Sequence, residues 1–295
     1  MASPKVSVLL PTWNGARDLR RLLPALAAQQ VQGGFEIRAI DSSSDDDTRD
    51  LLARAGAHVE RIDRARFQHG ATRNALARGA QGEVLVFLSQ DALPRGDDFL
   101  ATLASAFDAA EVGGAFARIL PHDDDDPLTA RTVLAAPEAS EHAAPTCFND
   151  VASAMRRDVH ARIPFPEVAF GEDSAWAALA LAAGLEIRFV PNAVVHHAHR
   201  YGPGQAYARY RVDAVFQREV HGRRVRPTLA SVLRGVAYEI RADLRFVRAT
   251  NAPLTSLVRS PMLRGAQVLG QWAGSRGALG PARDDALRVA RKDGA

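Results

Sequence analysis

The stretch KVSVLLPTWNG, residues 5–15, decides the fold. Its first six residues are an apolar run with β-branched side chains, closed by Pro11, and such a run predicts a buried strand. Asn14-Gly15 marks a turn, and leucines then recur at helical spacing from Leu19 to Leu26. The chain therefore opens with a strand, a turn and a helix, the repeating unit of α/β proteins.

The same alternation continues along the chain. Apolar runs predict further strands, and amphipathic stretches that end near a glycine predict the helices between them. The expected strands are residues 35–40, 58–62, 83–88, 148–155, 186–190 and 193–199, and the expected helices are residues 48–55, 70–78 and 174–183. This order indicates an α/β fold with a Rossmann-like, mostly parallel sheet flanked by helices.

Polar side chains directly follow two of the predicted strands. Asp41 follows the second strand, and Ser89-Gln90-Asp91 follows the fourth. In parallel sheets, ligands bind beyond the carboxyl ends of the strands, where a carboxylate such as Asp41 can accept hydrogen bonds from a base or a ribose. The neighbouring Asp45 to Asp47 fit a solvated, helix-capping loop instead. For Asp91, a metal–diphosphate site and a cap of the following turn fit the sequence equally well.

Three further groups carry side chains suited to chemistry. Glu172-Asp173 precede an apolar helix, where a carboxylate serves either as a general base or as a complement to the helix dipole. His197 and His199 lie two apart in a predicted strand, so they would share one face and could bind a metal or a diphosphate. Arg73 could hold phosphate through bidentate contacts, although an exposed surface arginine is the rival reading.

Composition narrows the class of protein. The 295 residues are 47% hydrophobic and 24% charged, which is typical of a globular chain and excludes wholesale disorder. Cys147 is the only cysteine, so an intrachain disulfide is excluded. The first residues lack the pattern of a signal peptide, and no run of eighteen apolar residues occurs. We therefore expect a cytoplasmic location.

Charge divides the chain into two parts. Residues 200–295 contain 18 basic and 7 acidic residues, or 18 − 7 = +11, whereas the rest contains 19 and 27, or 19 − 27 = −8. Helical patterns at residues 205–221, 228–250 and 256–272 fall in the basic part. We expect a nucleotide-binding domain at residues 1–204 and a helical basic extension at residues 205–295, loose from about residue 274.

The basic extension has two readings. Its helices either lie on an anionic membrane surface or pack on the catalytic domain with their arginines in water. Nucleic acid is not an expected partner, because the extension has no recognition-helix pattern and no interleaved aromatic residues.

Six motifs occur in a fixed order. They are VSVLLPTWNG at residues 6–15, IDSSSD at 40–45, FQHGATRN at 67–74, FLSQDALP at 87–94, FGED at 170–173 and VPNAVVHHAH at 190–199. Together they resemble the inverting family 2 glycosyltransferases with the GT-A fold, and more narrowly the bacterial rhamnosyltransferase-like branch. The resemblance covers about residues 5–211 continuously and the helical extension more weakly.

The resemblance implies roles for the matching positions. Asp173 matches the catalytic base, with Glu172 beside it to orient the acceptor or the loop. Asp91, with His197 or His199, matches the site of a divalent metal, Mg²⁺ or Mn²⁺. The residues that would contact the nucleotide sugar are Pro11, Thr12, Asn14, Asp41, Arg73, Asn74, Gln90 and Asp91.

Two positions depart from the family pattern. Ser89 stands where many relatives have the first aspartate of an Asp-x-Asp motif, so the expected metal site has one carboxylate fewer. The Ser-Gln-Asp-Ala form itself resembles the rhamnosyltransferase-like branch. Ala71 replaces a common glycine in the segment at residues 69–74.

The implied activity is a single in-line displacement by a hydroxyl of a glycan or lipid-linked glycan acceptor. A dTDP-β-L-rhamnose donor would give an α-L-rhamnoside, and pathway context would be cell-surface polysaccharide assembly. A UDP- or GDP-linked donor is an alternative, as is a non-catalytic nucleotide-sugar-binding scaffold. A nucleotide-dependent oxidoreductase is disfavoured, because PTWNG follows the first strand in place of the Gly-x-Gly-x-x-Gly turn.

Overall fold

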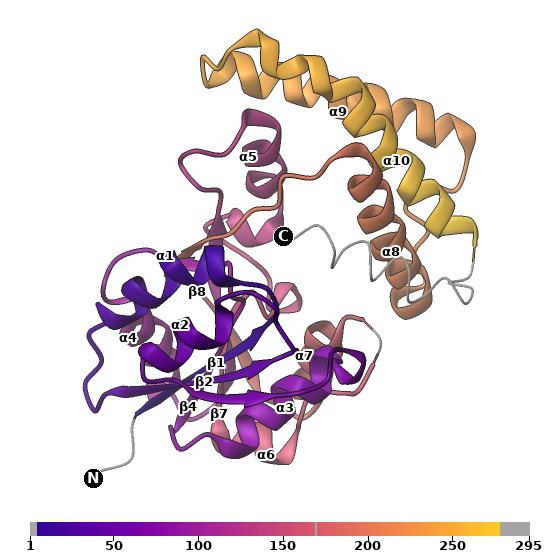
Figure 1. The fold of residues 1–295 in the computed structure, drawn as a ribbon. Coiled ribbons are helices and arrows are strands. Elements are labelled where there is room, and N and C mark those ends of the chain that lie inside the picture. Colours follow the sequence, from indigo (N-terminus) through magenta and orange to yellow (C-terminus); the bar gives the residue numbers. More distant parts are fainter. Residues whose placement is uncertain (1–4, 169, 278–295) are drawn as a thin grey trace. The chain divides into compact units, whose positions relative to one another are not determined.

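The opening apolar run forms strand β1, and the later runs join it in one eight-stranded sheet (Figure 1). The computed structural model describes residues 5–168 and 170–277. The chain divides into two units, residues 1–120 with 134–197 and residues 121–133 with 198–295. The whole sheet belongs to the first unit, and the segment at residues 121–133 joins the C-terminal helices in the second.

The sheet is mixed, with parallel pairing in the majority. Its strands are β1 (Val6–Thr12), β2 (Phe35–Asp41), β3 (His58–Arg61), β4 (Val84–Leu88), β5 (Leu93–Pro94), β6 (Val112–Leu120), β7 (Ala152–Arg156) and β8 (Glu186–His196). Their order across the sheet is β3-β2-β1-β4-β7-β6-β8-β5. Only β7 and β5 run antiparallel to their neighbours, so β1, β2, β3, β4, β6 and β8 all point the same way.

Helices cover both faces of the sheet. The helices of the first unit are α1 (Ala16–Ala27), α2 (Thr48–Arg54), α3 (His69–Gly79), α4 (Phe99–Ala104), α6 (Arg157–Arg162) and α7 (Glu172–Ala182). Side chains of α1, α2 and α4 share one buried cluster, and side chains of α3, α6 and α7 share another. Val8 and Leu10 of β1 point into the first cluster and Leu9 into the second, as strand alternation requires. The expected three-layer α/β fold is confirmed.

The C-terminal strand differs from the expectation. The sequence predicted two strands separated by Pro191-Asn192, but β8 runs unbroken through both residues to His196. The pairing of β8 with β6 shifts register between Ala117 and Arg118, opposite the segment from Val190 to Val194. A bulge of this kind accommodates a proline that cannot donate to the ladder. His197 and His199 therefore follow the strand, and the expectation that they share a strand face is wrong.

Strand β6 was not predicted, because its sequence VGGAFARIL lacks a strand pattern. Its glycines are required by packing. A Cβ on Gly114 would lie 2.6 Å from the ring of Trp176, a fully buried side chain of α7. The close approach of helix and strand thus selects a residue with low strand propensity.

The second unit is helical among the residues described. Its elements are α5 (Pro127–Leu134), α8 (Pro203–His221), α9 (Leu229–Ala249), the 3₁₀ segment η5 (Leu254–Arg259) and α10 (Ser260–Arg276). Helix α10 reaches Arg276, past the expected loose start at residue 274, and residues 278–295 of the predicted loose terminus lie outside the described residues. In the described part of the chain, no helix is both long and apolar enough to cross a membrane.

A buried ion network joins three helices of this unit. Asp243 of α9 is fully buried, and Arg264 of α10 donates to both of its carboxylate oxygens at 2.9 Å. Arg131 of α5 lies 2.5 Å from the same carboxylate and also contacts Glu239. A buried charge with several partners is costly to unpair, so this network fixes how α5, α9 and α10 pack.

Candidate active site

The direction of the strands brings the candidate residues to one edge of the sheet. Because β1, β2, β4 and β8 are parallel, their carboxyl ends meet at this edge. The residues that follow them are Trp13 to Gly15, Ser42 to Ser44, Ser89 to Asp91, and His197. Helices α3 and α7, which each precede a parallel strand, start at the same edge.

Asp41 is a buried anchor at the end of β2. Its side chain is fully buried, and it accepts hydrogen bonds from the Ser44 amide at 2.9 Å and the Ser44 hydroxyl at 2.5 Å. The hydroxyl of Thr12, its register neighbour on β1, donates to it at 3.3 Å. Arg49 approaches within 3.8 Å. Asp41 thus shapes the loop after β2, and its expected contact with a base stays a prediction.

The loops after β1 and β4 are tied together by Gln90. Its side-chain oxygen accepts from the Trp13 amide at 2.9 Å, and its nitrogen donates to the Trp13 carbonyl at 3.1 Å. A Cβ on Gly15 would collide with the end of the Gln90 side chain, so glycine there leaves room for Gln90 in this position. Asn14, at a φ of 44°, accepts from the Asp45 amide and links the loops after β1 and β2. These bonds hold the loops after β1, β2 and β4 together, and the expected contacts of Pro11, Thr12 and Asn14 with the nucleotide stay predictions.

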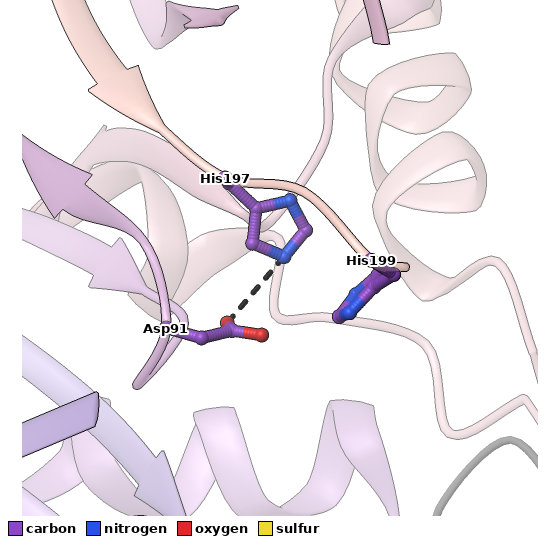
Figure 2. Close-up of side chains that lie close together, drawn as sticks. All are labelled: Asp91, His197 and His199. Carbon is purple, nitrogen blue, oxygen red and sulfur yellow. Dashed lines mark ion pairs between the residues drawn. The ribbon is translucent and has the colours of Figure 1, made fainter. Parts of the chain in front are cut away.

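A candidate metal site lies between the ends of β4 and β8. The nearest ligand atoms of Asp91, His197 and His199 all lie within 4.8 Å of one another (Figure 2). His197 Nε2 is 3.4 Å from Asp91 Oδ1, and its side chain is only 13% exposed. Since only Ala198 separates the two histidines, their nearness is set by the chain itself. One carboxylate and two imidazoles are a usable donor set for a divalent transition metal.

A second carboxylate at this site was not identified from the sequence. The pKa of Asp18, on the first turn of α1, is raised mainly by partial burial and then by the nearby charge of Asp91, while His197 opposes the rise. Asp18 thus lies within electrostatic reach of both residues. It belongs to the amphipathic pattern of α1, where an acidic residue in the first turn is ordinary, so its sequence gave no signal.

Glu172 and Asp173 begin helix α7. Gly171 precedes them in the left-handed conformation, at a φ of 78°. Glu172 is buried, whereas Asp173 is half-buried and accepts from the Ser174 amide at 2.7 Å. Burial, and then the charge of Glu172, raise the pKa of Asp173 above its ordinary value. A carboxylate with a raised pKa and partial access to solvent suits general-base work.

Arg73 and Asn74 of α3 point into the protein. Arg73 is buried, and its Nη1 donates to Glu172 Oε1 at 2.6 Å while its Nε lies 3.3 Å from Asp150 Oδ2. Asn74 donates to the Phe165 carbonyl and accepts from the Phe165 amide, and its oxygen lies 2.9 Å from His160 Nε2. Other groups of the protein therefore contact both side chains. The contacts with the nucleotide sugar that the sequence predicted for Arg73 and Asn74 stay predictions.

A cation–aromatic stack at the same edge was also missed. The guanidinium carbon of Arg64 lies 3.8 Å from the centre of the Trp13 ring, and it is 5.3 Å from that of Phe67. Arg64 belongs to the 3₁₀ segment η1 (Arg64–Arg66), for which sequence periodicity has no clear signature. The stack fixes Trp13 beside the Thr12–Asp41 pair.

Several known proteins are similar to this chain in sequence or in fold. Residues 7–162 match the family described as glycosyl transferase family 2. The O-antigen chain rhamnosyltransferase WbaN of Salmonella anatum is 32% identical over 228 residues, 72% of this chain and 72% of that protein. The O-antigen chain rhamnosyltransferase RfbN of Salmonella typhimurium is 30% identical over 227 residues, again 72% of each.

A solved structure supports the fold. The mannosyltransferase PcManGT of Pyrobaculum calidifontis, solved in complex with GDP-Man and Mn²⁺, has a TM-score of 0.56 and 21% identity, and the match covers 100% of this chain and 77% of that one. The GT-A fold is thereby confirmed, as are the glycosyltransferase class and the resemblance to rhamnosyltransferases of polysaccharide biosynthesis. The chain belongs to glycosyl transferase family 2, in its rhamnosyltransferase-like branch.

Proposed function

We propose that this glycosyltransferase transfers L-rhamnose, with inversion, from dTDP-β-L-rhamnose to a hydroxyl of a glycan or lipid-linked glycan. One observation supports this reaction most strongly: Asp173 is half-buried, its pKa is raised, and it lies at the same sheet edge as Asp91 and His197. The sugar is supported by the two relatives, which are both O-antigen chain rhamnosyltransferases.

Asp173 would act as the general base. Its ionised carboxylate accepts the proton of the acceptor hydroxyl as the hydroxyl oxygen bonds to the anomeric carbon. The bond from that carbon to the diphosphate oxygen breaks in the same step, and dTDP leaves. One displacement inverts the anomeric centre, so a β-linked donor gives an α-L-rhamnoside. The edge at Thr12, Asn14 and Asp41 would hold the nucleotide during this step.

Asp91, His197 and His199 would hold a divalent cation against the donor diphosphate. The residues fit, since one carboxylate and two imidazoles have ligand atoms close enough to share one ion. When bound, the cation supplies Lewis-acid stabilisation of the negative charge on the leaving diphosphate. Imidazole ligands suit Mn²⁺ better than Mg²⁺, which prefers oxygen ligands. We therefore propose Mn²⁺ as the more effective of the two.

A panel of dTDP-, UDP- and GDP-sugars tests the donor. We expect release of nucleoside diphosphate to be fastest with dTDP-β-L-rhamnose and to need added Mn²⁺. The matched comparison is dTDP-glucose, which shares the nucleotide and differs in the sugar. Turnover confined to a UDP- or GDP-sugar would still support a glycosyltransferase, but it would exclude dTDP-β-L-rhamnose as the donor. Binding of donors without any turnover, with acceptor extracts present, would favour a non-catalytic scaffold.

The second unit offers a surface for an anionic membrane. Leu229 and Leu233 of α9 are 67% and 73% exposed, and Tyr238 is exposed farther along the helix. Exposed arginines continue on this side of α9, which we call the α9 outer face, at Arg234, Arg241, Arg245 and Arg248. Leu233, Tyr238 and these arginines are mostly three or four residues apart, so they lie on one side of the helix, and Leu229 adds exposed apolar surface at its start. Apolar side chains among arginines favour a bilayer that contains anionic lipids.

Vesicle binding tests this surface. We expect the double variant Arg241→Gln/Arg245→Gln to bind phosphatidylglycerol-containing vesicles about 10- to 30-fold more weakly, because each arginine near such a surface contributes roughly 1 kcal/mol. The control Arg54→Gln/Arg78→Gln removes the same charge from exposed positions in the first unit. Equal losses in both variants would show that net charge alone acts, and would count against the α9 outer face.

A further inference from the structure

Arg73 lies at the centre of a buried group of charges. Its Nη1 donates to Glu172 at 2.6 Å, its Nε faces Asp150 at 3.3 Å, and its Nη2 donates to the Asp150 carbonyl at 3.4 Å. The carboxyl of Asp150 is buried before β7, where it also accepts from the Ser153 hydroxyl at 2.9 Å. One guanidinium therefore joins the start of α7 to the start of β7.

Asp173 is attached to the same structure. It follows Glu172 directly on α7, and the backbone amide of Asp150 is among the groups that hydrogen-bond to its carboxylate. Glu172 and Asp150, the two groups that hold Arg73, thus also border the proposed base. Any movement of Arg73 would be transmitted to Asp173 through the helix on one side and through a backbone amide on the other.

We propose that Arg73 and Asp150 are positioning residues, which together fix the orientation of the Asp173 carboxylate. This inference rests on the proposed role of Asp173 as base, and it gives Arg73 a task different from holding the donor diphosphate. A bidentate guanidinium suits the task because it fixes direction as well as charge.

The charges around Asp173 show how Arg73 acts on its protonation. The groups that interact with Asp173 are Glu172 on α7, Arg73 on α3, Asp150 before β7, and Glu138 on the 3₁₀ segment η3 (Pro137–Ala139), while His69 of α3 lies 3.8 Å from Glu172. Arg73 lowers the pKa of Asp173, against burial and Glu172, which raise it. Burial raises the pKa of Asp150 to about 8, and the pull of Arg73 offsets only part of that rise.

The substitutions at Arg73 and Asp150 have different expected effects on the pH profile of kcat. Arg73→Gln removes the positive charge beside Asp173, so the pKa of Asp173 rises and the acidic limb of kcat moves to higher pH. Because its raised pKa keeps Asp150 protonated below about pH 8, Asp150→Asn leaves the acidic limb in place and lowers the plateau of kcat through loss of the contact with Arg73. Arg73→Lys keeps the charge but loses the planar fork, so the limb stays while the plateau of kcat falls.

The test measures dTDP release from dTDP-β-L-rhamnose between pH 5 and pH 9 for the full chain and these variants. Each variant is expected to lower the plateau of kcat about 10- to 100-fold through misplacement of the base, with the donor KM unchanged within about twofold. Arg78→Gln, at an exposed position of the same helix, is the matched control and is expected to resemble the wild type. Thermal unfolding of each variant shows whether it is folded.

The outcomes separate the possible roles of Arg73. A raised donor KM with an unmoved pH limb in Arg73→Gln would assign Arg73 to the diphosphate and overturn the proposal. An acidic limb that moves equally in Arg73→Gln and Asp150→Asn would also overturn it. If Arg73→Gln does not fold, Arg73→Lys and Asp150→Asn decide, because an unchanged plateau of kcat in both would overturn the proposal. Failure of the proposed function is distinguishable, because Asp173→Asn would then retain full activity.

Discussion

Replacing Asp173 with Asn is expected to lower kcat by about 10²- to 10⁴-fold, the usual contribution of a general base. The amide has nearly the same shape as the carboxyl group and can still accept from the Ser174 amide, but it cannot take a proton from the acceptor. Donor binding should change little, so the loss appears in kcat and in kcat/KM equally. The measurement is initial-rate dTDP release at saturating donor.

The pH dependence of the wild-type enzyme tests the role of Asp173 as the base independently. Burial and Glu172 raise the pKa of Asp173, so its carboxylate takes up a proton at a higher pH than an ordinary aspartate does. Activity is therefore present above that pKa and is lost as the pH falls through it. The acidic limb should be absent from the residual activity of Asp173→Asn. Asp158→Asn, at an exposed position on α6, is the control and should keep both the rate and the limb.

Removal of divalent metal is expected to have the second large effect. A chelator should lower turnover by about 10²- to 10³-fold, since Lewis-acid stabilisation of the leaving group is worth several kcal/mol. Asp91→Asn should cause a similar loss at low Mn²⁺. His197→Ala should weaken Mn²⁺ more than His199→Ala, because His197 is the less exposed of the two and contacts Asp91 at 3.4 Å.

The control for the metal experiment is Asp98→Asn, an exposed aspartate seven residues beyond Asp91. It should leave the Mn²⁺ dependence unchanged. Full activity in chelator, with Asp91→Asn also active, would show that the cluster serves no metal and that protein groups alone stabilise the leaving diphosphate. Such a result would agree with the absence of the first aspartate at Ser89.

Local sequence patterns predicted most of the sheet in the first unit. Strands β1 and β4 are apolar runs buried on both faces, and their signal is strong because parallel strands are covered by helices on each side. In β2 charged and apolar residues alternate at first, and its last three residues are buried. The signal failed at β6, where Gly113-Gly114 makes room for Leu185 and Trp176. It also failed at β8, because a register shift lets Pro191 remain within one strand. Both are tertiary effects that no local window contains.

The sequence predicted where the candidate site lies, but it predicted the roles of the site residues only in part. Asp41 ends one parallel strand, and Asp91 and His197 follow two others, so the topology brings them to one edge once the strands are known. Roles depend on partners that come from distant parts of the chain. Arg73 lies beside Glu172, 99 residues away, and Asp150, 77 residues away, and neither contact leaves a mark in the sequence around Arg73.

The most direct test of the central claim is the configuration of the sugar that the enzyme first releases. We would mix near-stoichiometric enzyme and Mn²⁺ with dTDP-β-L-rhamnose, with water as the acceptor, and follow the anomeric protons by nuclear magnetic resonance before mutarotation equalises them. A single displacement assisted by Asp173 predicts that α-L-rhamnose appears first and that Asp173→Asn forms it at least about 10²-fold more slowly. Initial formation of β-L-rhamnose, or undiminished release by Asp173→Asn, would contradict the account.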